Sequence, residues 1–247
     1  MAKDKSERKV YGLHACEAVW GSRPEDIIRV YILKELVPRF GPLLKWCAEN
    51  KKAYHIVPAD ELKRICSSAH HEGICLLARS RESEDFTAAL AKLESLPSPR
   101  TVLVLDGIGN PHNFGSILRT AANFGVTMVL GRTAEIPTLS GAVARVSVGA
   151  AESANVVATD DLRGALSKLA KINFRIVSSS PRGKTLLSDY AFAKDTVIIL
   201  GGERSGVSAE ILSESHDNVT IPGSGQTESL NVSASTAVLL WERWKQL

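Results

Sequence analysis

Residues 105–120 read LDGIGNPHNFGSILRT, and this stretch decides how the C-terminal half of the chain is expected to fold. An apolar strand over 101–105 runs into a loop of glycine and proline, and a helix is expected from Phe114. Asn113 is predicted to cap that helix, whose free N–H groups favour an anion such as a phosphate. Arg119 follows nearly two turns later, so we expect it on the same side of the helix.

A second segment with the same form is ILGGERSGVS at residues 199–208. A buried strand is expected to end at its two glycines, Gly201 and Gly202, where a ligand could approach the backbone closely. Glu203 follows this turn and can accept a hydrogen bond from a hydroxyl group or orient a cation. These residues therefore predict one wall of a polar ligand site.

The third segment, IPGSGQTESLNVSA, spans residues 221–234 and leads from a strand into the final helix, with Asn231 as the expected cap. Each of the three segments is also compatible with an ordinary turn between a strand and a helix, with Arg119 as a surface cation. They would form one site only if their strands are neighbours in a sheet.

The wider pattern of the C-terminal half alternates apolar strands with helices, which predicts a mostly parallel sheet covered on both faces. The expected strands are 101–105, 127–130, 155–157, 173–178, 197–200 and 218–221, and the expected helices begin near 114, 140, 160, 208 and 232. The fold class is therefore α/β. A nicotinamide-dependent reductase is disfavoured because a GxGxxG fingerprint fails at His112.

The N-terminal part predicts a smaller α/β domain. Helices are expected at 14–20, 37–49 and 59–66, with strands at 27–33, 54–57 and 73–78. The expected organisation is a basic tail over 1–8, a small substrate-binding domain over 9–79, a linker over 80–100 and a catalytic domain over 101–247. The linker assignment rests on a charged stretch that contains one possible short helix and ends in Pro-Ser-Pro.

Composition narrows the class of protein further. The chain has 247 residues, 44% of them apolar, and a net charge of +3. Residues 1–80 hold 14 Lys and Arg against 10 Asp and Glu, a weak basic bias compatible with RNA contact. The four cysteines show no metal-binding spacing, so free thiols, no metal and a cytoplasmic location are expected. No apolar run is long enough to span a bilayer.

In order and spacing, the three segments resemble the three motifs of the SpoU (TrmH-like) branch of the SPOUT methyltransferase superfamily: NPxNxGxxxRTA, LGxExxG and IPxxGxxxSLNVS. The sequences YGLHA at 11–15 and HEGI at 71–74 resemble the ends of the small RNA-binding domain that precedes the catalytic domain in many members. The resemblance covers nearly the whole chain. Two departures are Ser235, where the third motif continues with alanine, and the acidic Glu228.

The resemblance implies an S-adenosylmethionine-dependent RNA 2′-O-ribose methyltransferase. The implied catalytic domain contains a trefoil knot and forms a homodimer. The partly shared apolar side of the last helix, formed by Val238, Leu239, Trp241 and Trp244, is a candidate for the dimer interface, although core packing explains it equally well. Ribosomal RNA is favoured as substrate, with transfer RNA ribose methylation or non-catalytic RNA binding as alternatives. The residues that match catalytic positions of the motifs are Arg119, Asn113, Glu203, Asn231 and Ser229. Those that match cofactor-binding positions are Gly201, Gly202, Ile221 and Leu230.

Overall fold

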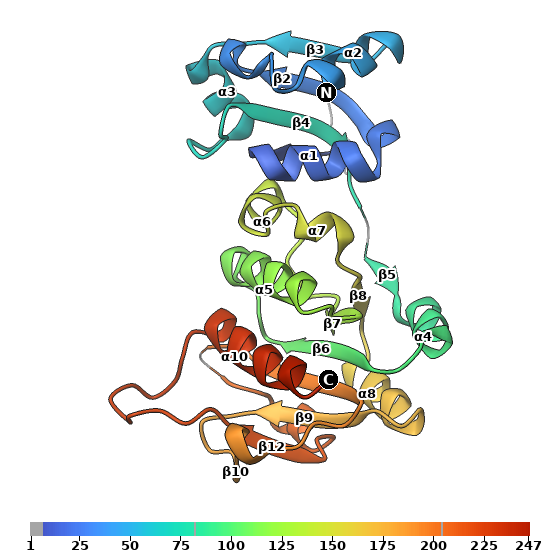
Figure 1. Ribbon diagram of the computed structural model, residues 1–247, viewed down its shortest axis with the longest axis vertical. Helices are drawn as coiled ribbons and strands as arrows, with labels where there is room; N and C mark the ends of the chain where they lie inside the picture. The colour runs from blue at the N-terminus through green and yellow to red at the C-terminus, as the bar shows by residue number, and fades with distance from the viewer. Residues whose placement is uncertain (1–6, 82, 204) are drawn as a thin grey trace. The chain divides into compact units, whose positions relative to one another are not determined.

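The computed structural model describes residues 7–81, 83–203 and 205–247, which form two compact units (Figure 1). The small unit consists of residues 7–81 together with Thr138–Ser153. The large unit consists of Ser83–Pro137 and Ala154–Leu247. Residues 1–6 of the predicted basic tail lie outside the described residues.

The large unit is built on an eight-stranded sheet in the order β10-β12-β9-β11-β6-β7-β8-β5. Every pairing in it is parallel, so the predicted α/β fold with a mostly parallel sheet is confirmed. The strands are β5 (Glu84–Asp85), β6 (Arg100–Asp106), β7 (Met128–Arg132), β8 (Val156–Thr159), β9 (Arg175–Ser179), β10 (Thr185–Leu186), β11 (Asp195–Gly201) and β12 (Asp217–Thr220). Strands β5 and β10 are short edge strands that the sequence pattern did not predict.

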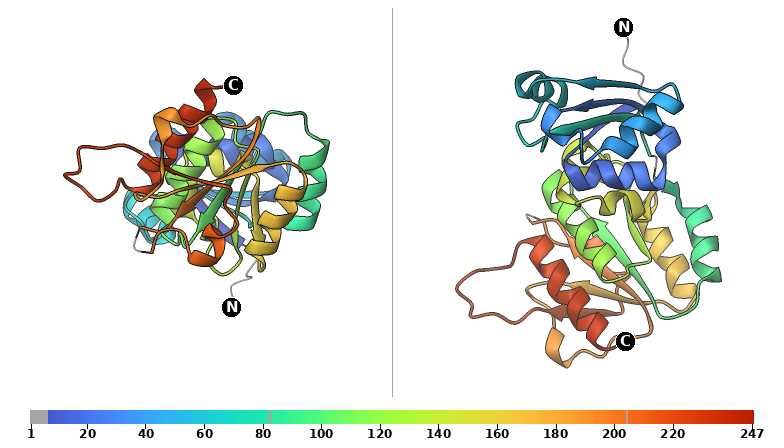
Figure 2. Two further views of the ribbon diagram at one scale, coloured as in Figure 1. Left: turned by 90° about the horizontal axis from the view of Figure 1, so that it is seen from below. Right: turned by 45° about the horizontal axis from the view of Figure 1, so that its top comes forward.

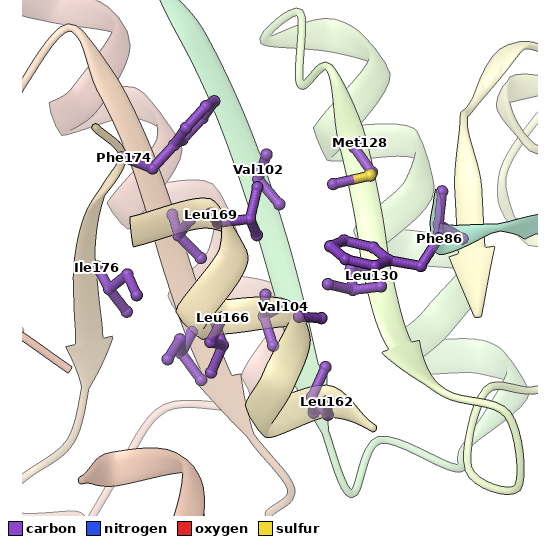
Figure 3. Packing of buried hydrophobic residues seen from close by; sticks show 14 of the residues in the cluster. Phe86, Val102, Val104, Met128, Leu130, Leu162, Leu166, Leu169, Phe174 and Ile176 are labelled. Atoms are coloured by element: carbon purple, nitrogen blue, oxygen red, sulfur yellow. The ribbon is translucent and has the colours of Figure 1, made fainter. Parts of the chain in front are cut away.

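Helices cover both faces of this sheet, because its central strands are apolar on both sides. They are α4 (Phe86–Ser95), α5 (Pro111–Asn123), α8 (Leu162–Lys171), α9 (Ala209–Leu212) and α10 (Val232–Lys245), with a 3₁₀ turn η3 (Leu187–Asp189). Helices α4 and α8 pack over one face, where Phe86, Leu166 and Phe174 are buried against strand residues (Figure 3). Helices α5 and α10 lie side by side, as both views of Figure 2 show.

Helix α4 occupies half of the segment predicted as a linker over 80–100. Asp85 caps it by accepting hydrogen bonds from the backbone N–H groups of Thr87 and Ala88. Its apolar residues Phe86 and Leu93 are buried in the core of the large unit. Residues 83–100 therefore belong to the large unit, and the interdomain stretch is shorter than the sequence suggested. The knot implied by the resemblance stays a prediction.

The small unit contains a four-stranded sheet in the order β1-β4-β2-β3. Strand β4 runs antiparallel to both of its neighbours, and β2 and β3 are parallel. The strands are β1 (Glu7–Tyr11), β2 (Ile27–Ile32), β3 (Ala53–Ile56) and β4 (Ile74–Arg79). Strand β1, which the sequence pattern did not predict, begins inside the segment assigned to the basic tail.

Two helices cover one face of the small sheet and a third covers part of the other. The helices are α1 (Leu13–Ser22), α2 (Gly41–Glu49) and α3 (Ala59–Cys66), with 3₁₀ turns η1 (Pro24–Asp26) and η2 (Lys34–Leu36). The helix predicted over 37–49 therefore begins only at Gly41, with Pro42 in its first turn, where proline is tolerated. All four cysteines are buried as free thiols.

Helices α6 (Gly141–Val146) and α7 (Ala150–Ser153) also belong to the small unit, although they follow β7 in sequence. Close backbone approach explains the two glycines of this segment. A Cβ at Gly141 would lie 2.4 Å from the Tyr11 ring, and one at Gly149 would lie 2.7 Å from Ala18. Gly149 also has a φ of 85°, a conformation that favours glycine.

A buried ion cluster fixes α7 to the rest of the small unit. The Glu152 carboxylate accepts from Arg8 Nη2 at 2.6 Å and from Arg23 Nε at 2.8 Å, and its side chain is 3% exposed. Arg81 donates to the Glu152 carbonyl oxygen at 2.5 Å. Burial lowers the pKa of the Arg8 guanidinium from its ordinary value. Glu152 therefore pairs with both buried arginines, and Asp26 is a second partner of Arg23 at 3.1 Å.

We expect Glu152→Gln to lower the free energy of unfolding of the small unit by about 3 kcal/mol, because it leaves the buried Arg8 without its counter-charge and leaves Arg23 with Asp26 alone. The matched control is Glu49→Gln in the exposed Lys45–Glu49 pair, which should cost less than about 0.5 kcal/mol. Urea titration followed by the fluorescence of Trp20 and Trp46 reports on this unit when Trp241 and Trp244 are replaced by phenylalanine. Equal losses for the two glutamates would contradict this role of Glu152.

Candidate active site

The predicted site forms at the carboxyl ends of the parallel strands in the large unit. Strands β6 and β11 are direct neighbours, with Asp106 paired with Gly201, so the first two predicted segments emerge side by side. Strand β12 is separated from β11 by β9. The third segment therefore reaches the site by its own loop, residues 221–231, which extends away from the sheet before returning at α10 (Figure 1).

Three side chains, one from each segment, meet in a polar cluster. Glu203 Oε1 accepts from Asn113 Nδ2 at 2.9 Å and from Asn231 Nδ2 at 2.5 Å. Asn231 Nδ2 also lies 3.2 Å from Asn113 Oδ1. These contacts confirm that the strand ends converge, and they leave Glu203 Oε2 outside both of these hydrogen bonds. We call this group the Asn–Glu–Asn cluster.

The sequence predicted the N-terminal cap of α10 correctly and that of α5 incorrectly. Asn231 caps α10 as expected, with its Oδ1 accepting from the Ser233 backbone N–H at 2.9 Å. Asn113 does not cap α5. Asn110 does so, with its Oδ1 accepting from the His112 N–H at 2.8 Å, and Pro111 takes the first helical position that proline favours. Asn113 therefore lies in the first turn, with its side chain free to contact Glu203.

A cavity of about 450 Å³ adjoins the Asn–Glu–Asn cluster, and Glu203 of the cluster is one of its lining residues. All four predicted cofactor-binding residues line this cavity: Gly201, Gly202, Ile221 and Leu230. Leu230 exposes 48% of its surface there. Leu212 and Val207 add further apolar wall, and Ser179, Ser180 and Ser229 add hydroxyl groups. The volume lies within the range usual for small-molecule sites.

The two glycines at the end of β11 also have a packing role that the sequence did not predict. A Cβ at Gly201 would lie 2.1 Å from the carbonyl carbon of Gly206, and one at Gly202 would lie 2.5 Å from the carbonyl oxygen of Gly107. Their small size therefore lets Gly206 and Val207 lie against the end of the strand and lets Gly202 pack against the first segment. The shape of the cavity depends on this packing, and the predicted approach of a ligand to these glycines stays a prediction.

The remaining predicted residues lie around this centre. Ser229 lines the cavity and is outside the Asn–Glu–Asn cluster. Arg119 is exposed on α5, and within the described part of the chain no hydrogen bond or ion pair joins it to the cluster. Glu228 and Ser235, the two departures from the third motif, both line the cavity. Among the described residues, no group of three His, Cys, Asp or Glu side chains could hold a metal ion.

Sequence reasoning missed the residues that hold the first two segments together. Asp106 is buried, and its Oδ2 accepts from the Ser208 backbone N–H at 2.7 Å, while its carbonyl oxygen accepts from Gly202 N–H at 2.8 Å. Arg132 pairs with Glu210 at 3.0 Å and approaches Asp106 at 3.9 Å. A buried aspartate at a strand end was the available signal.

A second missed group is the turn that follows β9, residues 179–182, which forms one wall of the cavity. The adjacent position of β9 and β11 places this turn beside Gly201. The strand itself was predicted, and its carboxyl end lies at the same sheet edge as the three motifs. Topology was therefore the signal that could have included this turn in the site.

Comparison with known proteins gives matches over both parts of the chain. Residues 100–241 match the SpoU rRNA methylase family, and residues 9–84 match the RNA 2′-O ribose methyltransferase substrate-binding family. An uncharacterised tRNA/rRNA methyltransferase, YfiF, of Escherichia coli O157:H7 is 35% identical over 97% of this chain and 68% of its own length. A 23S rRNA (guanosine-2′-O-)-methyltransferase, RlmB, of Coxiella burnetii is 30% identical over 100% of this chain and 97% of its own length. A further relative, from Haemophilus influenzae, is matched over only 65% of its length.

Solved structures of methyltransferases share this fold. A crystal structure of an RNA 2′-O ribose methyltransferase has a TM-score of 0.81 and 26% identity, covering 98% of this chain and 89% of the other. The SpoU methyltransferase AviRb of Streptomyces viridochromogenes, in complex with AdoMet, shares the fold with a TM-score of 0.80 at 18% identity, covering 98% and 90% of the two chains. Fold and site thus define an RNA 2′-O-ribose methyltransferase. The chain belongs to the SpoU rRNA methylase family.

We expect Asn231→Asp to separate the two roles of this side chain. Aspartate keeps the oxygen that caps α10 but replaces the donor to Glu203 by a second carboxylate, so methyl transfer should fall at least about 10-fold while the melting temperature changes little. Asn110→Asp is the matched control, because Asn110 caps α5 in the same way and makes no contact with Glu203. Single-turnover methylation and thermal unfolding measure the two effects. Equal activity in both variants would contradict the role of the Asn–Glu–Asn cluster.

Proposed function

We propose that this chain transfers the methyl group of S-adenosylmethionine to the ribose 2′-hydroxyl of a guanosine in 23S ribosomal RNA. The observation that carries the proposal is the Asn–Glu–Asn cluster at the rim of the cavity, formed by all three sequence motifs. The choice of RNA rests on relatives named for 23S rRNA guanosine methylation, which match this chain over nearly its whole length. Two solved structures named for transfer RNA modification alone cover 65% and 60% of this chain. YfiF, which is named for both kinds of RNA, covers 97% and does not distinguish between them.

The cavity suits S-adenosylmethionine in its chemistry. Leu212, Ile221 and Leu230 offer apolar surface to the adenine ring, and serine hydroxyls and backbone groups offer partners for the ribose and the amino-acid portion. The cofactor supplies a sulfonium methyl group, which is already a strong electrophile with a neutral thioether as leaving group. The difficult task for the protein is therefore to prepare the nucleophile.

The nucleophile is a ribose hydroxyl, which must be aligned with the methyl carbon and lose its proton as it attacks. Glu203 is held by two amide donors through Oε1, so Oε2 is available to accept a hydrogen bond from the ribose hydroxyl and to take its proton. Arg119 is a poor base because the pKa of arginine is above about 12. We assign it to hold an RNA phosphate and to stabilise the developing alkoxide. Asn113 and Asn231 are positioning residues that fix Glu203.

The assignment predicts which 2′-O-methyl group is lost when the gene is deleted and how Arg119 affects it. Mapping of 2′-O-methyl sites should show one 23S guanosine unmodified in the deletion strain and restored by the wild-type gene. Arg119→Lys should restore it poorly and slow single-turnover methylation at least about 10-fold, because lysine lacks the bidentate guanidinium. Arg163→Lys, an exposed arginine of α8 paired with Glu214, is the control. Near-normal turnover by Arg119→Lys would overturn the guanidinium role, and an unchanged methylation map would overturn the substrate.

The proposed active form is a homodimer that uses the exposed side of α10. Trp241 and Trp244 are each 50% exposed and stack on each other at 5.6 Å between ring centroids, and Val238 is 38% exposed nearby on the same helix. An apolar surface of this kind is typical of a protein interface. We place the enzyme in the cytoplasm with its RNA. No helix of the described residues is both long and apolar enough to cross a membrane.

Light scattering at micromolar concentration should give twice the chain mass of 26.6 kDa. Trp241→Glu should give a monomer, because it places a charge in the proposed interface. Leu96→Glu is the control, since Leu96 is 45% exposed at the end of α4 on another surface of the large unit. A wild-type monomer, or a Trp241→Glu dimer of unchanged stability, would contradict the proposed interface.

A further inference from the structure

One face of the small sheet is only partly covered by a helix. The strand register places two rows of side chains across this face. The first row is Tyr11, Cys75, Tyr31 and His55, and the second is Lys9, Leu77, Arg29 and Ala53. Helix α3 packs Leu62 and Cys66 against Tyr11 and Cys75, which are buried. The other end of each row, on β2 and β3, remains open, with His55, Arg29 and Ala53 exposed.

The open end carries a stacked aromatic pair. The rings of Tyr31 and His55 lie 5.4 Å apart between centroids with an angle of 20° between their planes. Tyr31 is half-buried against the apolar cluster that contains Leu62 and Cys66 of α3, and this packing fixes its ring. His55 is exposed. Strand β3 is the edge strand of the sheet, and among the described residues no strand pairs with its outer side. The outer side of the stack therefore has room for another flat ring.

A cationic group stands beside the stack. Arg29 donates from Nη1 to the hydroxyl of Tyr31 at 3.2 Å, which aligns the guanidinium with the ring while leaving its charge uncompensated by that partner. Lys9 lies in the same row as Arg29, and Arg79 lies on the same face of β4. Glu7, opposite Arg79, is the carboxylate on this face of β1. Lys9 donates to the Ile65 carbonyl oxygen of α3, and Arg79 pairs with Asp26 at 3.8 Å, so Arg29 is the cation of this face that stands beside the stack.

A flat stack with an adjacent guanidinium is suited to an unpaired nucleobase and its phosphate. Bases stack on aromatic side chains, and arginine binds the backbone; in a duplex the bases are stacked on one another and are out of reach. The neighbouring Ala53 leaves space over the edge strand, where a larger side chain would fill it. These features favour single-stranded RNA over a duplex.

We propose that the face formed by Tyr31, His55 and Arg29 is a binding site for an unpaired nucleotide of the substrate RNA. This inference rests on the proposed function, because it takes the RNA to be the substrate of the large unit. It assigns a definite surface within the substrate-binding match over residues 9–84. His55 stacks on the base, Tyr31 supports His55, and Arg29 contacts the phosphate.

The test is the affinity of the full-length protein for a fluorescently labelled single-stranded RNA, measured by anisotropy. His55→Ala should weaken binding about 5- to 100-fold, the usual effect of losing one base stack. His55→Phe should retain binding, because it keeps a flat ring. Tyr54→Ala is the matched control, since Tyr54 is the next residue of β3, is 42% exposed and points to the opposite face. Arg29→Gln should reduce the slope of log affinity against log salt by about 1.

The outcomes separate this proposal from the proposed function. If wild-type protein methylates RNA but His55→Ala binds as tightly as Tyr54→Ala, the stacking site is wrong and the enzyme assignment stands. If binding depends on His55 but the wild type transfers no methyl group, the stacking site stands and the proposed function fails. A duplex of the same sequence that binds as tightly as the single strand would also overturn the stacking site.

Discussion

The parallel pairing of β6 with β11 is the constraint on which the active site depends. Their register brings Asp106 level with Gly201, and the Gly202 N–H donates to the Asp106 carbonyl oxygen, so the first two motifs leave the sheet as one layer. The Asp106 carboxylate then fixes the Ser208 backbone, and glycines at 107, 201 and 202 allow the two loops to touch. Without this contact Glu203 would have no fixed position relative to Asn113.

Asn231 completes the site from the loop that follows β12. Its one side chain has two roles. Its side-chain oxygen caps the N-terminus of α10, and its side-chain nitrogen donates to Glu203. The start of the helix and the position of the carboxylate are therefore coupled. The loop before it is largely exposed and lines the cavity through Glu228, Ser229 and Leu230. Residues 228–231 thus supply both the polar Asn231, which holds Glu203, and the apolar Leu230, which suits the cofactor.

Much of this arrangement could be predicted from the sequence, because strand periodicity and motif order define the sheet and its reactive edge. The cap of α5 was placed three residues too late, although Pro111 already indicated Asn110. Helix α4 was assigned to a linker, although Phe86, Ala89 and Leu93 have helical spacing. The Asn–Glu–Asn hydrogen bonds depend on side-chain geometry, and the burial of Glu152 depends on two arginines more than 120 residues away. Neither leaves a local pattern.

The position of α6 and α7 changes what counts as a module in this protein. The small unit is made of two separate chain segments, and the chain passes between the units three times, near residues 82, 137 and 153. A truncation that removes residues 1–82 would therefore not yield an intact catalytic half. It would strip α6 and α7 of their partners and leave Val143, Ala144 and Glu152 without the surfaces that bury them. The catalytic family match over residues 100–241 therefore includes a segment, Thr138–Ser153, that packs in the small unit. A chain without residues 7–81 needs a different sequence after β7 if these two helices are not to expose their apolar residues.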